Sequence, residues 1–298
     1  MRFVARLANG NHGLQYLGPT LRGAFGYLLK AIVCQVKHGR CHECPLRGIC
    51  PYPAIFEGRP PEDRAVMRKY PAIPQPFVLD VAGPGAWDGE PDELRFGIRL
   101  FGATAQWTPY IVETFRRMGE IGLGAKRIPF VLLAVAQGDR TVWARGEDVV
   151  SKVDPAPVDT SARAPDGTIR WQFVTPVHLE EPTTRGDATV DPLKLILAGR
   201  RRRFLLEAFY GSGATEETPA SFVDAAEFRV VSSSLQTWRI RRFSGRQQRS
   251  VPLAGVVGEM TVAGPWSRAG DWMSSVEHTH VGKYSTFGFG RVRWEVVQ

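Results

Sequence analysis

Long apolar runs are missing from this sequence of 298 residues. No stretch approaches the roughly 20 apolar residues that a membrane-spanning helix needs. The first residues, MRFVARLANG, lack the long apolar core of a secretory signal peptide. We therefore expect a cytoplasmic protein without a membrane partner. Common enzyme signatures are missing too, because the sequence has no HExxH zinc motif, no dinucleotide-binding fingerprint and no Ser/His/Asp spacing typical of hydrolases.

Cysteine is scarce and confined to one segment, residues 34–50. In a reducing compartment such a cluster predicts a metal site rather than a disulfide framework. One CxxC pair with two further thiolates favours a tetrahedral structural zinc site, and the alternatives are an iron–sulfur cluster or unligated thiols. His42, inside the segment, is an alternative ligand. A closed four-cysteine site has no open position for substrate, so its expected role is structural, fixing the end of the first helix to the segment behind it. We expect no cofactor in catalysis. The predicted ligands are Cys34, Cys41, Cys44 and Cys50.

Acidic residues are in the minority, at 30 Asp and Glu against 38 Lys and Arg, so the formal net charge is +8. A basic surface suits a polyanion such as nucleic acid, although positive charge also keeps ordinary proteins soluble. Four successive arginines, Arg200–Arg203, interrupt an apolar helix. Because helical neighbours lie about 100° apart, these arginines cannot share one face. One or two must contact the body of the protein or an ion partner, unless all four are solvated around the helix.

A second basic stretch, residues 238–249, alternates at the period of a β-strand. This alternation predicts two faces, one with Arg239 and Arg241 and the other with Trp238, Ile240 and Arg242. The GRQQR tip that contains Arg246 and Arg249 is then free to contact an RNA backbone.

A glycine-rich basic loop, GKYSTFGFGR, begins at Gly282. Glycines let backbone N–H groups approach phosphates, hydroxyls add donors, and aromatic rings stack on bases. The loop is not a nucleotide-binding P-loop, because no GK[ST] opens a helix. The alternative is a glycine-rich connection between elements of a basic protein. Its candidate RNA contacts are Gly282, Tyr284, Ser285, Thr286, Gly288, Gly290 and Arg291.

The order of predicted elements is β-α-β-β-α-β in each half of the chain, which is the ferredoxin-like unit. Asp191 and Pro192 predict the N-cap and first residue of a helix that stops at Gly211. Gly122-Leu-Gly124 precedes an apolar strand in the first half, as Gly288-Phe-Gly290 does in the second. We therefore expect an α+β protein with tandem ferredoxin-like, RRM-like domains and a small metal-binding cysteine insertion. The predicted domains are 1–150, with the cysteines at 34–50, and 168–298, with the loop at 282–290.

Histidine is the natural proton-transfer residue for RNA cleavage, and the sequence has six. Attack by the 2′-hydroxyl needs a base, an acid and cationic stabilisation of the phosphorane, but no metal. His38, just past the first helix, and His280, beside the glycine-rich loop, have the best positions. For any single histidine, a surface or hydrogen-bonded structural role is the alternative.

Several motifs together resemble a known family, the CRISPR repeat-processing endoribonucleases of the RAMP superfamily, in the branch with a cysteine-bearing N-terminal half. The motifs are LGPTLRGAFG at 17–26, the cysteine segment ending in CPYPAIFE, GEIGLGAKRIPF at 119–130, FVTPVHL at 173–179, RRFSGRQ at 241–247 and HVGKYSTFGFGR at 280–291.

This resemblance implies tandem ferredoxin-like domains, binding of CRISPR repeat RNA and a role in antiviral defence. It also implies metal-independent cleavage to a 2′,3′-cyclic phosphate and a 5′-hydroxyl. The family's catalytic histidine often lies on or just after the first helix. Here residues 21–36 contain none, so His38 is the candidate base and Tyr27 a helper, with His280 and Lys283 as a second constellation. The predicted RNA contacts outside the loop are Arg22, Lys126, Arg127, Arg200, Arg201, Arg239, Arg241, Arg242 and Arg246.

Two other functions fit the same residues. One is a non-catalytic RNA-binding subunit of a CRISPR effector complex, since the same fold serves there. The other is a zinc-stabilised nucleic-acid adaptor unrelated to CRISPR. Tight repeat binding without cleavage would favour the first alternative.

Overall fold

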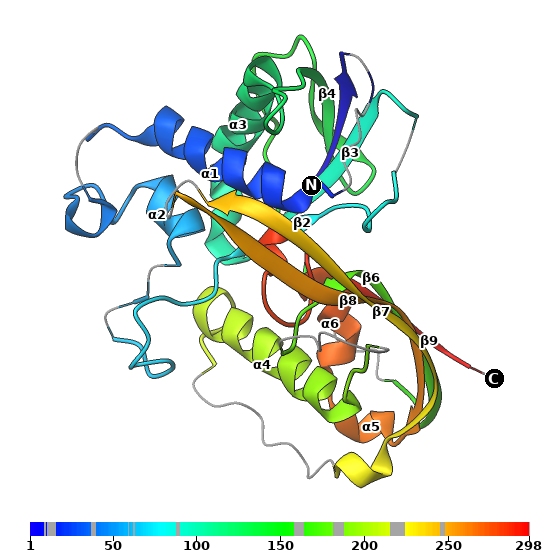
Figure 1. Ribbon diagram of the computed structural model, residues 1–298. Coiled ribbons are helices and arrows are strands. Elements are labelled where there is room, and N and C mark those ends of the chain that lie inside the picture. The colour runs from blue at the N-terminus through cyan, green and yellow to red at the C-terminus, as the bar shows by residue number, and fades with distance from the viewer. Residues whose placement is uncertain are drawn as a thin grey trace.

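The structure, a computed structural model, describes residues 1–8, 10, 16–36, 40–58, 60–61, 63–87, 90–157, 164–180, 188–214, 224–244 and 248–297. The chain forms two α+β halves, each with an antiparallel sheet and packed helices (Figure 1). The predicted fold class is therefore confirmed. None of the described helices is both long and apolar enough to cross a membrane.

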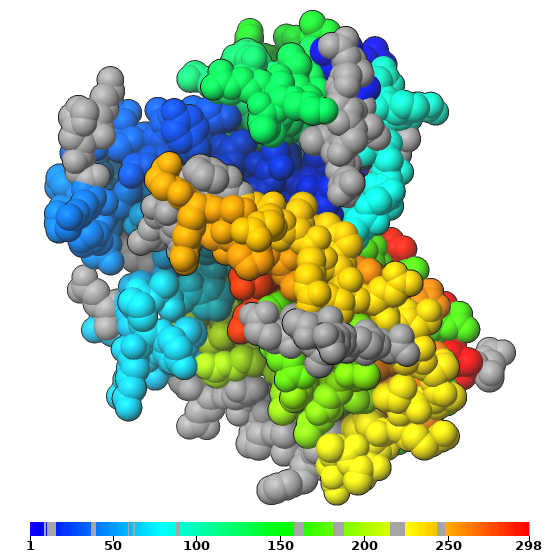
Figure 2. Space-filling model, viewed as in Figure 1, coloured from blue at the N-terminus to red at the C-terminus, as the bar shows by residue number. Residues whose placement is uncertain are grey.

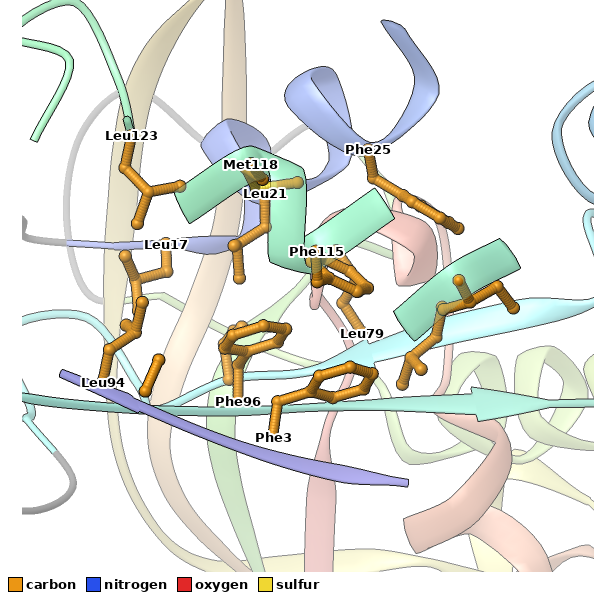
Figure 3. Close-up of a cluster of buried hydrophobic side chains, with 14 of the residues drawn as sticks. Phe3, Leu17, Leu21, Phe25, Leu79, Leu94, Phe96, Phe115, Met118 and Leu123 are labelled. Carbon is orange, nitrogen blue, oxygen red and sulfur yellow. The ribbon is translucent and has the colours of Figure 1, made fainter. Parts of the chain in front are cut away.

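The first half has a five-stranded sheet in the order β2-β3-β1-β4-β5. Phe115 of the second long helix packs on Phe3 and Phe96 of the sheet, with ring centroids 4.8 Å apart in both pairs (Figure 3). Burying these rings stabilises the half, because each large side chain contributes about 1.5–3 kcal/mol when removed from water. Its elements are β1 (Arg2–Leu7), α1 (Gly18–Val33), η1 (Cys41–Glu43), α2 (Pro51–Phe56), β2 (Phe77–Asp80), β3 (Glu93–Leu100), η2 (Gly102–Trp107), α3 (Thr108–Ile121), β4 (Phe130–Gln137) and β5 (Arg140–Ala144).

The second half has a four-stranded sheet in the order β7-β8-β6-β9. This is the first half's order, apart from the extra β5, so the two sheets repeat one topology. Its core is a tryptophan stack in which Trp171 lies parallel to Trp272 at 5.6 Å. Its elements are β6 (Gly167–Val177), α4 (Pro192–Tyr210), η3 (Ala225–Glu227), β7 (Arg229–Ser244), β8 (Arg249–Gly264), α5 (Trp266–Ala269), α6 (Trp272–Thr279), η4 (Ser285–Phe287) and β9 (Val292–Val296).

Local sequence signals explain where the helices begin. Asp191 caps α4, because its carboxylate accepts a 2.8 Å hydrogen bond from the backbone N–H of Leu193. Pro192 follows as the first helical residue and Gly211 ends the helix, as predicted. Pro109 lies in the first turn of α3, where a missing N–H leaves no helical hydrogen bond unmade.

The β7–β8 hairpin of the second half crosses onto the first half (Figures 1 and 2). Trp238 of β7 packs edge-on against Tyr16 at 5.0 Å. Leu253 of β8, together with Phe287 and Phe289, belongs to the hydrophobic core of the first half. The two halves therefore meet at a shared seam formed by α1, β2, the hairpin and the segment that contains η4.

Candidate functional site

The glycine-rich loop lies at this seam and is packed on both sides. Its backbone is bound to the second half, since the N–H groups of Lys283 and Gly290 donate to the carbonyls of His178 and Pro176, both at 2.9 Å. Gly290 has φ +80°, and a Cβ there would lie 2.0 Å from the carbonyl oxygen of Val281. A Cβ on Gly288, at φ +79°, would lie 2.6 Å from Val81. Gly288 therefore serves close packing between the halves, and Gly290 serves close packing within the second half.

This packing corrects the prediction of an open phosphate cradle. Ser285 and Thr286 are buried, so their hydroxyls do not face a surface where RNA could bind. Gly288 and Gly290 are buried too. The loop residues nearer to solvent are Lys283, which is exposed, and Gly282, Tyr284 and Arg291, which are half-buried.

His280, the second candidate base, is completely buried between the halves. Its Nδ1 lies 2.8 Å from the carbonyl oxygen of Phe289 and its Nε2 lies 3.2 Å from Oδ1 of Asp80 on β2. Both neighbours are oxygen atoms that accept hydrogen bonds, so both ring nitrogens have a partner within the protein. A side chain enclosed in this way cannot reach a 2′-hydroxyl. The structure therefore gives His280 an interdomain structural role in place of the predicted catalytic one.

Asp80 is the centre of a buried polar network that joins the halves. Its Oδ2 pairs with Nε of Arg99 at 2.7 Å, and another nitrogen of Arg99 lies 2.7 Å from Nδ1 of His278. Burial opposes ionisation of Asp80, but the hydrogen bond from His280 and the charges of His280 and Arg99 outweigh it and hold the pKa of Asp80 well below its usual value. Burial, with the charge of Arg99, lowers the pKa of His278. The sequence shows Asp80 at a strand end, but nothing in it points to partners about 200 residues away.

Two arginines from opposite halves meet on the ring of Phe287. The guanidinium of Arg22 on α1 lies 4.6 Å from the ring centre, and that of Arg242 on β7 lies 4.7 Å from it. Burial and the charge of Arg242 lower the pKa of Arg22 to about 10, so Arg22 remains charged at neutral pH. The sequence predicted RNA contacts at both arginines, but it did not show that they are neighbours.

The hairpin presents further arginines on its other face. Arg239 and Arg241 are exposed, whereas Trp238, Ile240 and Arg242 turn toward the first half, so the predicted alternation is confirmed. Nε of Arg241 donates to the hydroxyl of Ser250 at 3.2 Å. Arg246 lies outside the described residues.

The four successive arginines of α4 point in different directions, as their helical spacing predicts. Arg202 turns inward, and its Nε donates to the carbonyl of Thr279 at the end of α6, at 3.1 Å. Burial lowers the pKa of Arg202 to about 10. Arg203 forms an ion pair with Asp271. Arg201 is exposed and Arg200 half-buried, and both have interactions with the protein.

The remaining candidates lie in the first half. Tyr27 on α1 is 75% exposed, so its hydroxyl is accessible to a ligand. Lys126 and Arg127 are exposed on the loop after α3. His38, the leading candidate base, lies outside the described residues, five positions beyond the last residue of α1.

The four cysteines line one cavity of about 230 Å³ beside the end of α1. None forms a disulfide. Burial raises the pKa of the Cys41 and Cys50 thiols. The sulfur of Cys34 donates to the carbonyl of Val36 at 3.2 Å. Across the part of the chain that the structure describes, no three metal-binding side chains are already arranged to hold an ion. The predicted metal centre therefore remains a prediction, supported by the shared cavity.

Comparisons with known proteins agree with this architecture. Residues 1–155 match a family model described as "N-terminal domain", and residues 171–292 match one described as "CRISPR-associated endoribonuclease Cas6". No curated protein matches the chain.

Similar solved structures have low sequence identity to this chain. A Cas6 product complex is similar, with a TM-score of 0.52 and 13% identity over 99% of both chains. Cas6 from Thermus thermophilus has a TM-score of 0.47 and 14% identity, covering 99% of this chain and 98% of that one. A Cas6-related protein from Pyrococcus furiosus has a TM-score of 0.44 and 11% identity, covering 100% of this chain and 99% of that one.

Proposed function

Because residues 171–292 match the family model of the Cas6 CRISPR-associated endoribonucleases, we propose that this chain is a member of that family. It cuts CRISPR precursor RNA within the repeat, without a metal, by attack of a ribose 2′-hydroxyl. The observation that carries the proposal is the cationic seam, where Arg22 and Arg242 from the two halves meet. Such a cluster suits an RNA backbone, because phosphate contacts provide most of the sequence-independent affinity. Exposed Lys283 adds a cation at the same seam.

The cleavage step needs a base on the 2′-hydroxyl and an acid at the leaving oxygen. We assign the base to His38, the position that the family resemblance implies. Of the other candidates, His178 and His280 are buried, and Nδ1 of half-buried His278 lies 2.7 Å from a nitrogen of Arg99. The base takes the 2′-proton, the 2′-oxygen attacks phosphorus, and the bond from phosphorus to the 5′-oxygen breaks. A proton delivered to that oxygen completes a 5′-hydroxyl and leaves a 2′,3′-cyclic phosphate. Tyr27 is our candidate for a helper at this step.

The chemistry of the product ends tests this proposal. The protein should cut RNA of the CRISPR repeat carried by its own genome in the presence of EDTA, and mass spectrometry should find a cyclic phosphate. The same RNA with a single 2′-deoxy nucleotide at the cleavage position should bind and remain uncut. Cleavage of the deoxy RNA, or cleavage only after a divalent metal is added, would refute the mechanism.

One observation favours a second function, a non-catalytic RNA-binding subunit of a CRISPR effector complex. Among the described histidines, His178 and His280 are buried and His278 is half-buried. His42 is exposed, but it lies in the cysteine segment beside Glu43. Tight binding of repeat RNA without cleavage, with and without added Mg²⁺, would support this second function.

We also propose that the cysteine cavity holds a structural zinc ion. Four thiols line one cavity, which is the number of ligands that a tetrahedral zinc site needs, and such a site would fix the end of α1 to the segment that follows it. Elemental analysis of the purified protein should find about one zinc per chain. Visible absorption and iron in the same sample would instead indicate an iron–sulfur cluster.

A further inference from the structure

Arg22 and Arg242 occupy an unusual electrostatic position for charged side chains that are half-buried. Across the residues that the structure describes, neither guanidinium forms an ion pair with a carboxylate, and the Nε atom of each is buried without a hydrogen-bond partner. Arg22 has one hydrogen bond to a side chain, a long one of 3.5 Å to the amide oxygen of Gln75. Two like charges are thus held together with no anion between them.

Two other partly buried arginines in this protein are neutralised by carboxylates: Arg99 is paired with Asp80 at 2.7 Å, and Arg203 with Asp271. Half-buried Arg202 instead donates its Nε to the backbone carbonyl of Thr279 at 3.1 Å. Burying a cation without a counter-ion is costly, so such a group is normally paired. We infer from this contrast that Arg22 and Arg242 are neutralised by an anion that the chain itself does not supply.

The geometry distinguishes a phosphate from a nucleobase as the occupant. A base would need an open aromatic face, but the Phe287 ring is only 7% exposed and both guanidiniums lie against it. A guanidinium stacked on a ring keeps its N–H edge free, and that edge matches two oxygens of a phosphate. The ring therefore acts as a platform that orients the two donor edges.

We propose that Arg22 and Arg242 together hold one phosphate of the bound RNA, with Phe287 as the platform between them. The proposal rests on the proposed function only in that the protein must bind RNA. Since α1 and the hairpin belong to different halves, one bound phosphate also joins the two halves across the seam. Bound RNA should therefore stabilise their association as well as neutralise the pair.

The test is a double-mutant cycle on RNA affinity across a salt series. The probe is repeat RNA with a 2′-deoxy nucleotide at the cleavage position, so that cutting does not enter the measurement. Neutralising one phosphate contact on a single strand should lower the slope of log affinity against log salt by about 0.7. Arg22→Gln and Arg242→Gln should each lower the slope by no more than this amount, because the other arginine still contacts the phosphate, and should weaken binding by about tenfold or more.

The double variant decides whether the arginines share a phosphate. If they do, the double variant should lose about 0.7 of slope in total, the loss for one phosphate. A total loss of about 1.4 would indicate two separate phosphates and overturn the proposal, as would single variants that bind like the wild type. Arg242→Lys should retain most of the slope, because the charge remains.

Three controls keep the outcomes separate. Arg117→Gln, which removes one charge from α3, should leave the salt slope unchanged. Circular dichroism should show that each variant is folded, and a misfolded glutamine variant is replaced by its methionine counterpart, which also removes the charge. If the wild type binds no RNA, the proposed function fails; if the wild type binds and the arginine variants do too, only this inference fails. If inorganic phosphate raises the melting temperature while the arginine variants bind RNA like the wild type, the site binds free phosphate and the proposal is overturned.

Discussion

Replacing His280 with alanine should destabilise the protein while leaving cleavage by the folded protein intact. The change removes the contact to the Phe289 carbonyl at 2.8 Å and the contact to Asp80 at 3.2 Å. Leaving one buried hydrogen-bonding group without its partner costs about 1–3 kcal/mol. Two contacts are lost, although Arg99 still pairs with the other oxygen of Asp80, so we expect a total of about 3 kcal/mol. At about 2 °C per kcal/mol for a chain of this size, the melting temperature should fall by roughly 6 °C.

The assay pairs thermal unfolding with single-turnover cleavage of repeat RNA, well below both melting temperatures. His280→Asn is the matched variant, because asparagine tolerates the left-handed backbone at φ 59° and its amide can still donate to the Phe289 carbonyl. It should recover part of the lost stability. The reasoning is refuted if His280→Ala melts like the wild type, or if the folded variant no longer cuts RNA.

Three further predictions concern packing, pH and metal. Gly18→Ala should destabilise the protein by about 1–3 kcal/mol, because its Cβ would lie 1.8 Å from the Phe287 carbonyl oxygen. The control Gly23→Ala has nothing within 4 Å of its Cβ and should stabilise α1 by about 0.5–1 kcal/mol. Urea titration measures both changes. Because its pKa is lowered in the folded protein, the ionised carboxylate of Asp80 stabilises the fold at neutral pH. This contribution is lost as pH falls below about 4. The difference in unfolding free energy between the wild type and Asp80→Asn should therefore shrink in acid. Cys44→Ser should abolish stoichiometric zinc in elemental analysis and lower the melting temperature; an unchanged melting temperature would contradict a structural metal.

Much of the fold follows from local signals in the sequence. The cap at Asp191 and the stop at Gly211 lie within a few residues of the backbone groups that they bond, so both ends of α4 can be predicted from the local sequence. The alternation around Trp238 gave the correct faces of β7, because side chains in a strand point to alternate sides. The repeated element order predicted two similar sheets, and both have the same strand order.

The seam could not be predicted, because its contacts join residues far apart in the chain. The glycine-rich loop reads as a phosphate cradle, since glycine, hydroxyl and basic residues suit one. Its glycines are instead used for close packing, and Phe287 and Phe289 enter the core of the other half. His280 looked accessible beside that loop, but its partner Asp80 comes from a strand of the first half. No local pattern shows that Arg22 and Arg242 are neighbours.

The central claim is that this protein cuts CRISPR repeat RNA with a histidine just beyond its first helix. Single-turnover cleavage in EDTA by the six single His→Ala variants tests it most directly. We predict that His38→Ala lowers the cleavage rate by about 10²–10⁴-fold and retains RNA affinity, while the other five variants cut at close to the wild-type rate when folded. Equal cleavage by all six variants, or no cleavage by the wild type, would contradict the claim.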